Sequence, residues 1–218
     1  EQMERILSDY QTPEALPATM RYLRSRPREK EKFITDAHLK SIAEAKSEIV
    51  ISNAYFIPNR EFRTALKEAV HRGVNVIIHT NDAEGNNLLP MMTTLSRKIY
   101  HNLLKANDDN GTGGSLRIFE WNGDEYGQYT LHSKWMVVDR TLGIVGSYNI
   151  DARSEFLNSE NAVVFDQTVL AGQLLTLFER DLVYSQEIDR ETARKWSHIT
   201  GWTDFWNTVF GNLLRRNL

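Results

Sequence analysis

A strand–helix–strand pattern in the first half of the chain places the strongest constraint on its fold. Residues 48–52 and 74–79 are apolar runs of strand length, and residues 60–72 between them carry apolar side chains at helical spacing. Gly73 follows this segment, and glycine commonly ends a helix. Two strands joined by a helix pair in parallel within one sheet, and the helix packs on a face of that sheet. We therefore expect an α/β protein.

Composition limits the number of domains and the kinds of chemistry. The chain has 218 residues, 41% of them hydrophobic, which is enough for one globular domain with a sizeable core. Its net charge of −3 gives no overall basic balance that would favour nucleic acid. The absence of cysteine excludes disulfides, thiol catalysis and Cys-ligated zinc. The chain contains no run of 18 or more apolar residues, so the sequence predicts no membrane-spanning helix.

Polar residues in the stretch 131–160 predict one site. His132 and Lys134 are two apart in a run that then becomes apolar, so the period of a strand puts both side chains on one face. A second short strand over residues 142–145 leads to Ser147 and Asn149. A histidine, a lysine, a hydroxyl and an amide are thus expected together at strand ends.

These residue types suit displacement at a phosphodiester. Such a reaction needs a nucleophile, groups that stabilise the non-bridging oxygens, and an acid for the leaving alcohol. With an ordinary pKa near ~6.5, His132 can be the nucleophile or the acid. Lys134 supplies a positive charge, and Ser147 and Asn149 supply neutral donors, so a phosphate can be held without a metal or other cofactor.

A carboxylate behind His132 would fix its tautomer and stabilise the imidazolium. Glu160 is the preferred candidate for this role, and Asp139 is the second.

The residues from His132 to Asn149 spell HxKx4Dx6GSxN, which resembles the signature of the phospholipase D superfamily. The run DxRSxxxNxE from Asp151 to Glu160 is similar to the second half of bacterial cardiolipin synthases and related phosphatidyltransferases. The resemblance covers residues 33–184. It implies an α/β/α sandwich in which helices flank a mixed, largely parallel central sheet.

The resemblance also implies roles for the residues. His132 would be the phosphohistidine-forming nucleophile or its acid partner, Lys134 and Asn149 would bind phosphate, and Glu160 would hold the histidine. Superfamily enzymes bring two HxK motifs together, and this chain supplies one. The other HxK, at His38, lies in a helical pattern where the two side chains diverge, so we reject it as a second site.

Two explanations of the single motif remain open. Either the chain is the C-terminal half of a two-motif protein, which we favour, or two copies complete the site as a homodimer. On this basis residues 33–185 form a catalytic half-domain. Residues 1–32 are expected to be a linker or N-terminal arm, whose basic run attracts anionic lipid or is simply solvated. Residues 186–218 are expected to be an amphipathic helical tail that contacts a membrane interface or packs on the domain.

Aromatic residues in two loops are candidates for lining the substrate. Tyr55 and Phe56 follow the strand at residues 48–52, and ligands often lie beyond strand ends in such sheets. Tyr126 and Tyr129 lie in the loop that leads to His132. His79, at the end of a strand, is interpreted as structural or as a polar residue at the rim.

The leading hypothesis is a phosphatidyltransferase or phospholipase of the cardiolipin-synthase type, acting on phospholipid as a peripheral protein of the bacterial inner membrane. The second is a homodimeric endonuclease of the same superfamily, which the acidic pI of about 6.1 disfavours. The third is a non-catalytic lipid- or partner-binding half-domain. The sequence leaves transfer and hydrolysis unresolved, because both share the covalent step.

Overall fold

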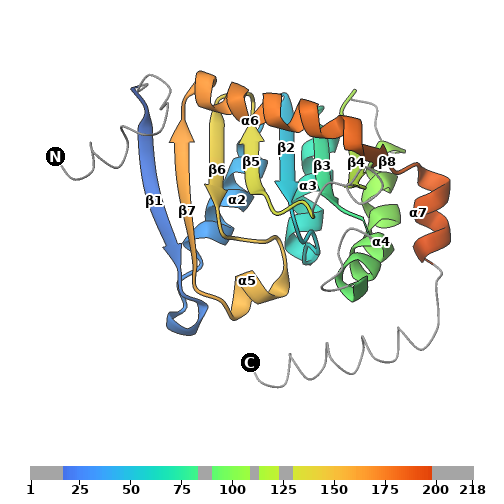
Figure 1. Ribbon diagram of the computed structural model, residues 1–218, viewed down its shortest axis with the longest axis horizontal. Coiled ribbons are helices and arrows are strands. Elements are labelled where there is room, and N and C mark those ends of the chain that lie inside the picture. The colour runs from blue at the N-terminus through green and yellow to red at the C-terminus, as the bar shows by residue number, and fades with distance from the viewer. Residues whose placement is uncertain (1–16, 83–89, 109–112, 123–129, 198–218) are drawn as a thin grey trace.

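One eight-stranded sheet organises the protein (Figure 1). The computed structural model describes residues 17–82, 90–108, 113–122 and 130–197. Within these residues the strand order is β1-β7-β6-β5-β2-β3-β4-β8. The strands are β1 (Thr19–Ser25), β2 (Glu48–Asn53), β3 (Asn75–Asn81), β4 (Ser115–Trp121), β5 (Lys134–Val138), β6 (Leu142–Gly146), β7 (Glu160–Asp166) and β8 (Ser185–Glu187).

The sheet is mixed, as expected. The predicted parallel pair is confirmed in β2 and β3, and β4 pairs in parallel with β3. The other five pairings among the described residues are antiparallel. The expectation of a largely parallel sheet is therefore wrong. The connections from β5 through β7 contain no crossover helix long enough to return the chain in parallel, so these strands meet as antiparallel neighbours.

Helices cover both faces of the sheet (Figure 1). Buried residues of α2 and α3 share the larger core cluster with Met136 and Val138 of β5. Buried residues of α6 share a second cluster with Trp135 and Val137 on the opposite face. The helices are α2 (Phe33–Glu44), α3 (Arg60–His71), α4 (Pro90–Leu104), α5 (Ala152–Phe156), α6 (Thr168–Asp181) and α7 (Arg190–Ser197), with 3-10 turns η1 (Pro27–Glu29), η2 (Lys105–Asn107) and η4 (Leu182–Tyr184).

The expected chain-end segments are not as the sequence suggested. Strand β1 belongs to the sheet, where it pairs along its length with β7, so the linker expected over residues 1–32 is wrong for this part. Only Leu23 of β1 packs against the core, which leaves little apolar signal in an edge strand. At the other end, β8 and α7 are part of the domain, since Ala193 is fully buried and Trp196 packs against the core. Residues 198–218 lie outside the described part.

The strand directions bring many polar residues to one end of the sheet. The carboxyl ends of β2, β3, β4 and β6 lie there together with the first residues of β5 and β7 (Figure 1). We call this end the polar edge. Helix α5 lies beside the polar edge (Figure 1). The HxK motif begins at this end of the sheet, at the start of β5.

Candidate active site

His132 and Lys134 lie at the polar edge, at the start of β5. His132 is exposed just before the strand, and Lys134 is its first, half-buried residue. The Lys134 Nζ donates a hydrogen bond of 3.0 Å to the backbone oxygen of His132. The nearby ammonium charge, together with partial burial, lowers the pKa of His132. The imidazole is therefore kept neutral near pH 7, the form that can act as a nucleophile.

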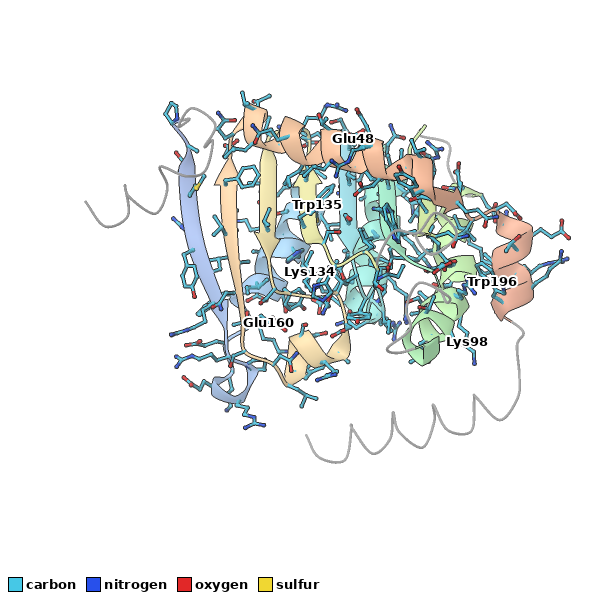
Figure 2. The ribbon with its side chains drawn as sticks, viewed as in Figure 1. Glu48, Lys98, Lys134, Trp135, Glu160 and Trp196 are labelled. Carbon is cyan, nitrogen blue, oxygen red and sulfur yellow. The ribbon has the colours of Figure 1, made fainter. Side chains whose placement is uncertain are left out.

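Lys134 is subject to opposing effects. Burial lowers the pKa of Lys134, while the negative charges of Glu160 and Asp151 act in the opposite direction. Figure 2 shows Lys134 and Glu160 near the same edge of the sheet. A half-buried ammonium group beside His132 that forms no ion pair of 4 Å or less with the described carboxylates is a suitable binding group for a phosphate.

Glu160 is held by three neutral donors. Its Oε1 accepts hydrogen bonds from Ser154 Oγ at 2.8 Å and Asn158 Nδ2 at 3.2 Å, and its Oε2 accepts one from Ser147 Oγ. The side chain is buried at the first residue of β7. Among the described residues, Glu160 makes no hydrogen bond to His132. The structure thus brings Glu160 toward Lys134 and not behind the histidine of the same chain.

Ser147 is occupied by this network. Its hydroxyl donates to Glu160 and accepts a hydrogen bond of 3.0 Å from the backbone nitrogen of Asn161. A hydroxyl has one proton to donate, so in this arrangement Ser147 cannot also donate to a phosphate. The expectation that it binds phosphate directly is wrong for this state, and the residue instead holds the carboxylate.

Asn149 has unused hydrogen-bonding capacity. Its Oδ1 is buried with no hydrogen-bond partner within the described residues. The backbone nitrogen of Asn149 donates to Ser154 Oγ at 3.1 Å, which ties the loop to the Glu160 network. A buried acceptor without a partner is costly unless a ligand or water completes it. The geometry leaves Asn149 available to a ligand.

Gly146 permits the close contact between β6 and β7 at this site. A Cβ added to Gly146 would lie 2.1 Å from the backbone oxygen of Asn161 and 2.7 Å from the Cα of Ala162. Both are backbone atoms, so the strands would have to separate. The glycine of the motif is thus required for β7 to place Glu160 against Ser147.

Asp139 lies at the opposite end of β5 from His132. Its carboxylate accepts hydrogen bonds from the backbone nitrogens of Lys46, Ser47 and Glu48, and from Ser47 Oγ. Partial burial raises the pKa of Asp139, but hydrogen bonds from Glu48 and Ser47 outweigh it and lower the pKa overall. The proposed catalytic role of Asp139 is wrong, because the length of β5 separates it from the histidine.

The four aromatic candidates have different outcomes. Phe56 is wrong as a substrate contact, since it is fully buried in the core. Tyr55 is partly exposed next to it and remains a prediction. Tyr126 and Tyr129 lie outside the described residues. His79 is fully buried, which agrees with a structural residue and not with one at the rim.

Two buried asparagines at strand ends position the loops of the site, and the sequence analysis missed both. Asn81 Oδ1 accepts from the backbone nitrogen of Leu131 at 2.9 Å, and its Nδ2 donates to the oxygen of Leu131 at 2.8 Å. Asn53 Oδ1 accepts from the nitrogen of Ile150 at 3.2 Å, and its Nδ2 donates to the oxygen of Tyr148 at 3.3 Å. The available signal was an asparagine that ends an otherwise apolar strand.

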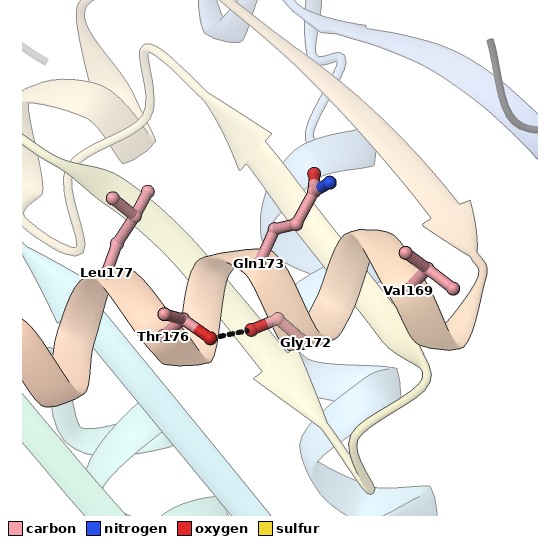
Figure 3. A pocket seen from close by; sticks show the side chains of 5 residues that line it. All are labelled: Val169, Gly172, Gln173, Thr176 and Leu177. Carbon is pink, nitrogen blue, oxygen red and sulfur yellow. Dashed lines mark hydrogen bonds between the residues drawn. The ribbon is translucent and has the colours of Figure 1, made fainter. Parts of the chain in front are cut away.

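Other features do not add to this site. Within the described ranges, no group of three or more His, Cys, Asp or Glu side chains is arranged to hold a metal ion. A shallow hollow lies on α6, where it is lined by Val169, Gly172, Gln173, Thr176 and Leu177 (Figure 3). No helix in the described part of the chain is long and apolar enough to cross a bilayer.

Comparison with known proteins identifies related sequences. The family model for "Cardiolipin synthase, PLD-like domain" matches residues 39–182. Cardiolipin synthase A from Erwinia tasmaniensis is 28% identical over 188 residues, which is 84% of this chain and 34% of the relative. Cardiolipin synthase A from Buchnera aphidicola is 28% identical over 196 residues, 88% of this chain and 36% of the relative. The chain spans about a third of the length of these curated relatives.

Solved structures share the fold. The phospholipase D family member NUC from Salmonella typhimurium superposes with a TM-score of 0.60 at 20% identity, covering 79% of this chain and 99% of NUC. Phosphatidylserine synthase from Haemophilus influenzae superposes with a TM-score of 0.69 at 13% identity, covering 94% of this chain and 47% of the synthase. The predicted phospholipase D-like sandwich and the resemblance to cardiolipin synthases are confirmed.

Proposed function

This chain belongs to the cardiolipin synthase, PLD-like domain family, and on that premise we propose that it carries half of a phosphodiester-cleaving active site. The reaction is transfer of a phosphatidyl group to an alcohol or to water through a phosphohistidine. The observation that carries the proposal is an exposed His132 whose pKa is lowered beside Lys134. Asn149, whose Oδ1 has no hydrogen-bond partner among the described residues, lies on the loop after β6, at the same edge of the sheet.

In the first step a ring nitrogen of the nucleophilic histidine attacks phosphorus. A phosphorus–nitrogen bond forms, the bond to the leaving alcohol breaks, and a second histidine protonates that alcohol. In the second step an acceptor hydroxyl loses its proton to the second histidine and displaces the first. Lys134 and Asn149 stabilise the charge on the non-bridging oxygens. His132 takes one of the two histidine roles.

The second histidine has to come from outside the motif described above. Buried His38 and His79 lie in the core and not beside His132. Completion by the other half of a longer protein agrees with a match that spans only about a third of the curated relatives. Completion by a second copy of the chain is the alternative, and the molar mass in solution distinguishes the two for this chain.

The substrate is proposed to be a phospholipid in a membrane that the protein contacts peripherally, as at the bacterial inner membrane. The segment 21–32 carries six basic and two acidic residues. It lies beside the polar edge, since Lys32 Nζ is 4.4 Å from the centre of the Phe156 ring in α5. Phe33 follows it and is 55% exposed. Basic side chains beside exposed aromatic ones favour an anionic lipid surface.

The test is phospholipid turnover by the intact protein on anionic vesicles, with products identified by mass spectrometry. His132→Gln is expected to lower turnover at least a hundredfold, because it removes an acid–base or nucleophilic group. Arg140→Gln is a matched control, since Arg140 is exposed at the opposite end of β5 and pairs with Glu48. Unchanged turnover by His132→Gln would contradict catalysis and support a lipid- or partner-binding domain.

The same protein should be tested on DNA. A homodimeric endonuclease would use the same residues, and its DNA binding would weaken steeply with salt. Salt-sensitive DNA cleavage that depends on His132, without phospholipid turnover, would favour that alternative.

A further inference from the structure

A buried chain of hydrogen bonds connects the start of β5 with β8. Ser133, which lies between His132 and Lys134, has its Oγ 2.6 Å from Ser52 Oγ in β2. Ser52 Oγ is 3.2 Å from His79 Nδ1 in β3, and His79 Nε2 is 3.0 Å from Ser185 Oγ in β8. Ser52 is 1% exposed and His79 is 0% exposed. The middle of this chain is thus shielded from water, while its two ends at Ser133 and Ser185 are partly buried.

The direction of these hydrogen bonds follows from the last one. Ser185 Oγ donates its proton to the backbone oxygen of Asp181 at 2.9 Å, so it can only accept from His79 Nε2. A neutral imidazole with its proton on Nε2 accepts at Nδ1, and the donor there is Ser52. Ser52 has then used its proton, so its oxygen accepts from Ser133. One carbonyl oxygen therefore sets the direction of all four bonds.

The imidazole of His79 is fixed in place by its surroundings. The rings of Trp121 and Phe178 contact it edge-on, with centroids at 6.1 and 5.6 Å. Burial lowers the pKa of His79 to about 4, so the neutral form assumed above is the form present near pH 7. A rigid neutral ring with one defined tautomer is suited to orient the groups at both of its nitrogens.

Ser133 is held at two points as a result. Its hydroxyl donates to Ser52, and its backbone oxygen accepts a hydrogen bond of 2.9 Å from the nitrogen of Ala54. Leu131, two residues earlier, is held by Asn81. The His132 ring is exposed and makes no hydrogen bond to the described residues, but the backbone on both sides of it is held in place.

We propose that His79 is a positioning residue of this site, which acts through Ser52 on Ser133 to hold His132 and Lys134 at the start of β5. This inference rests on the proposed function of His132. The need for such a device is geometric, since a displacement of about 1 Å in a catalytic group can lower a rate about a hundredfold. His79 contacts neither substrate nor the reacting atoms, and its effect is exerted through the backbone of residues 132–134.

The first test does not require activity. The imidazole of His132 in the chain is titrated by NMR, in the wild type and in Ser52→Ala. Because the Lys134 charge lowers the pKa of His132, loosening the backbone of residues 132–134 is expected to raise that pKa toward ~6.5. Ser52→Thr, which restores the hydroxyl in a residue favoured in strands, is expected to restore the wild-type value. Ser41→Ala is the control, because Ser41 is also a buried hydroxyl but donates within α2 to Ala37.

His79 itself is tested with two variants. His79→Asn places an acceptor near the position of Nδ1, so the pKa of His132 is expected to stay at the wild-type value. His79→Phe keeps an aromatic ring but removes the acceptor, so the pKa of His132 is expected to rise. If His79→Phe does not fold, the comparison of His79→Asn with Ser52→Ala still applies. An unchanged His132 titration in both Ser52→Ala and His79→Phe would overturn the proposal.

The second test uses turnover by the intact protein. Ser52→Ala, Ser133→Ala and the double variant are each expected to lower kcat about ten- to a hundredfold with little change in KM. The double variant should be no worse than either single variant, since both remove the same bond. Additive losses would overturn the proposal. If the wild type shows no turnover while the NMR shifts occur, the proposed function fails and the positioning inference stands.

Discussion

Acid should destabilise this protein through two buried histidines. His38 and His79 are almost fully buried, and burial lowers the pKa of each to about 4. In the unfolded chain each should titrate near ~6.5. Between pH 6.5 and 4 the unfolded state therefore binds more protons than the folded state. Stability contributed by the neutral rings is present above pH 6.5 and is lost as the pH falls toward 4.

The size of the effect follows from the two pKa values. A difference of about 2.5 units corresponds to about 3 kcal/mol per histidine once the pH has fallen below both values. At pH 5 linkage gives a loss of about 2 kcal/mol per histidine relative to pH 7 and above. Two such losses are a large fraction of the roughly 5–15 kcal/mol that stabilises a typical domain.

Urea unfolding at pH 7 and pH 5 measures this loss, and a non-titrating variant isolates one histidine. His38 makes a 2.8 Å hydrogen bond to the backbone oxygen of Ile34 and stacks on Tyr148. His38→Gln can still donate to that oxygen but cannot gain a proton. It is expected to be less stable than the wild type at pH 7, yet to lose about 2 kcal/mol less between pH 7 and pH 5. Parallel pH dependence of the two proteins would refute the reasoning.

Three further substitutions test how the site is built. Gly146→Ala should lower turnover, because a Cβ would lie 2.1 Å from a backbone oxygen and push β7 away; Gly172→Ala, with no atom within 4 Å, should leave turnover unchanged. Asp139→Asn should lower the unfolding free energy measured in urea by about 1–3 kcal/mol while turnover per folded molecule is retained, and loss of turnover alone would contradict its anchoring role. Asn81→Ala leaves both backbone groups of Leu131 without this partner, so it should cost about 2–3 kcal/mol and lower kcat. A stable Asn81→Ala variant with normal kcat would contradict the role of Asn81 in holding Leu131.

Much of the fold was accessible from the sequence because its signals are local. The apolar period and Gly73 identified the parallel pair, and the spacing of His132 and Lys134 identified one end of β5. Strand β1 was missed because Leu23 is its only residue that packs against the core. The sequence of this edge strand therefore shows no clear apolar period.

The parts that could not be predicted depend on three-dimensional distance. Asp139 is close to Lys134 in the motif, but at about 3.3 Å per residue a strand of this length carries it to the other end of the sheet. Ser147 appeared as a phosphate donor because its partner, Glu160, is thirteen residues away in sequence. Ser52 and His79 seemed ordinary strand residues, and Asn81 fell beyond the strand expected over residues 74–79. Their roles depend on pairing between β2, β3 and the start of β5.

The covalent intermediate offers the most direct test of the central claim that His132 takes part in phosphodiester chemistry. The intact protein is mixed with anionic phospholipid vesicles, quenched during turnover, and its histidine peptides are analysed by mass spectrometry. The account predicts a phosphatidyl adduct on a histidine in the wild type. If His132 is the nucleophile, the adduct is lost in His132→Ala; if His132 is the acid and base, an adduct on the other histidine persists but is released far more slowly, because the acceptor lacks its base. Wild-type turnover and adduct release in His132→Ala, or turnover with no adduct on any histidine, would contradict it.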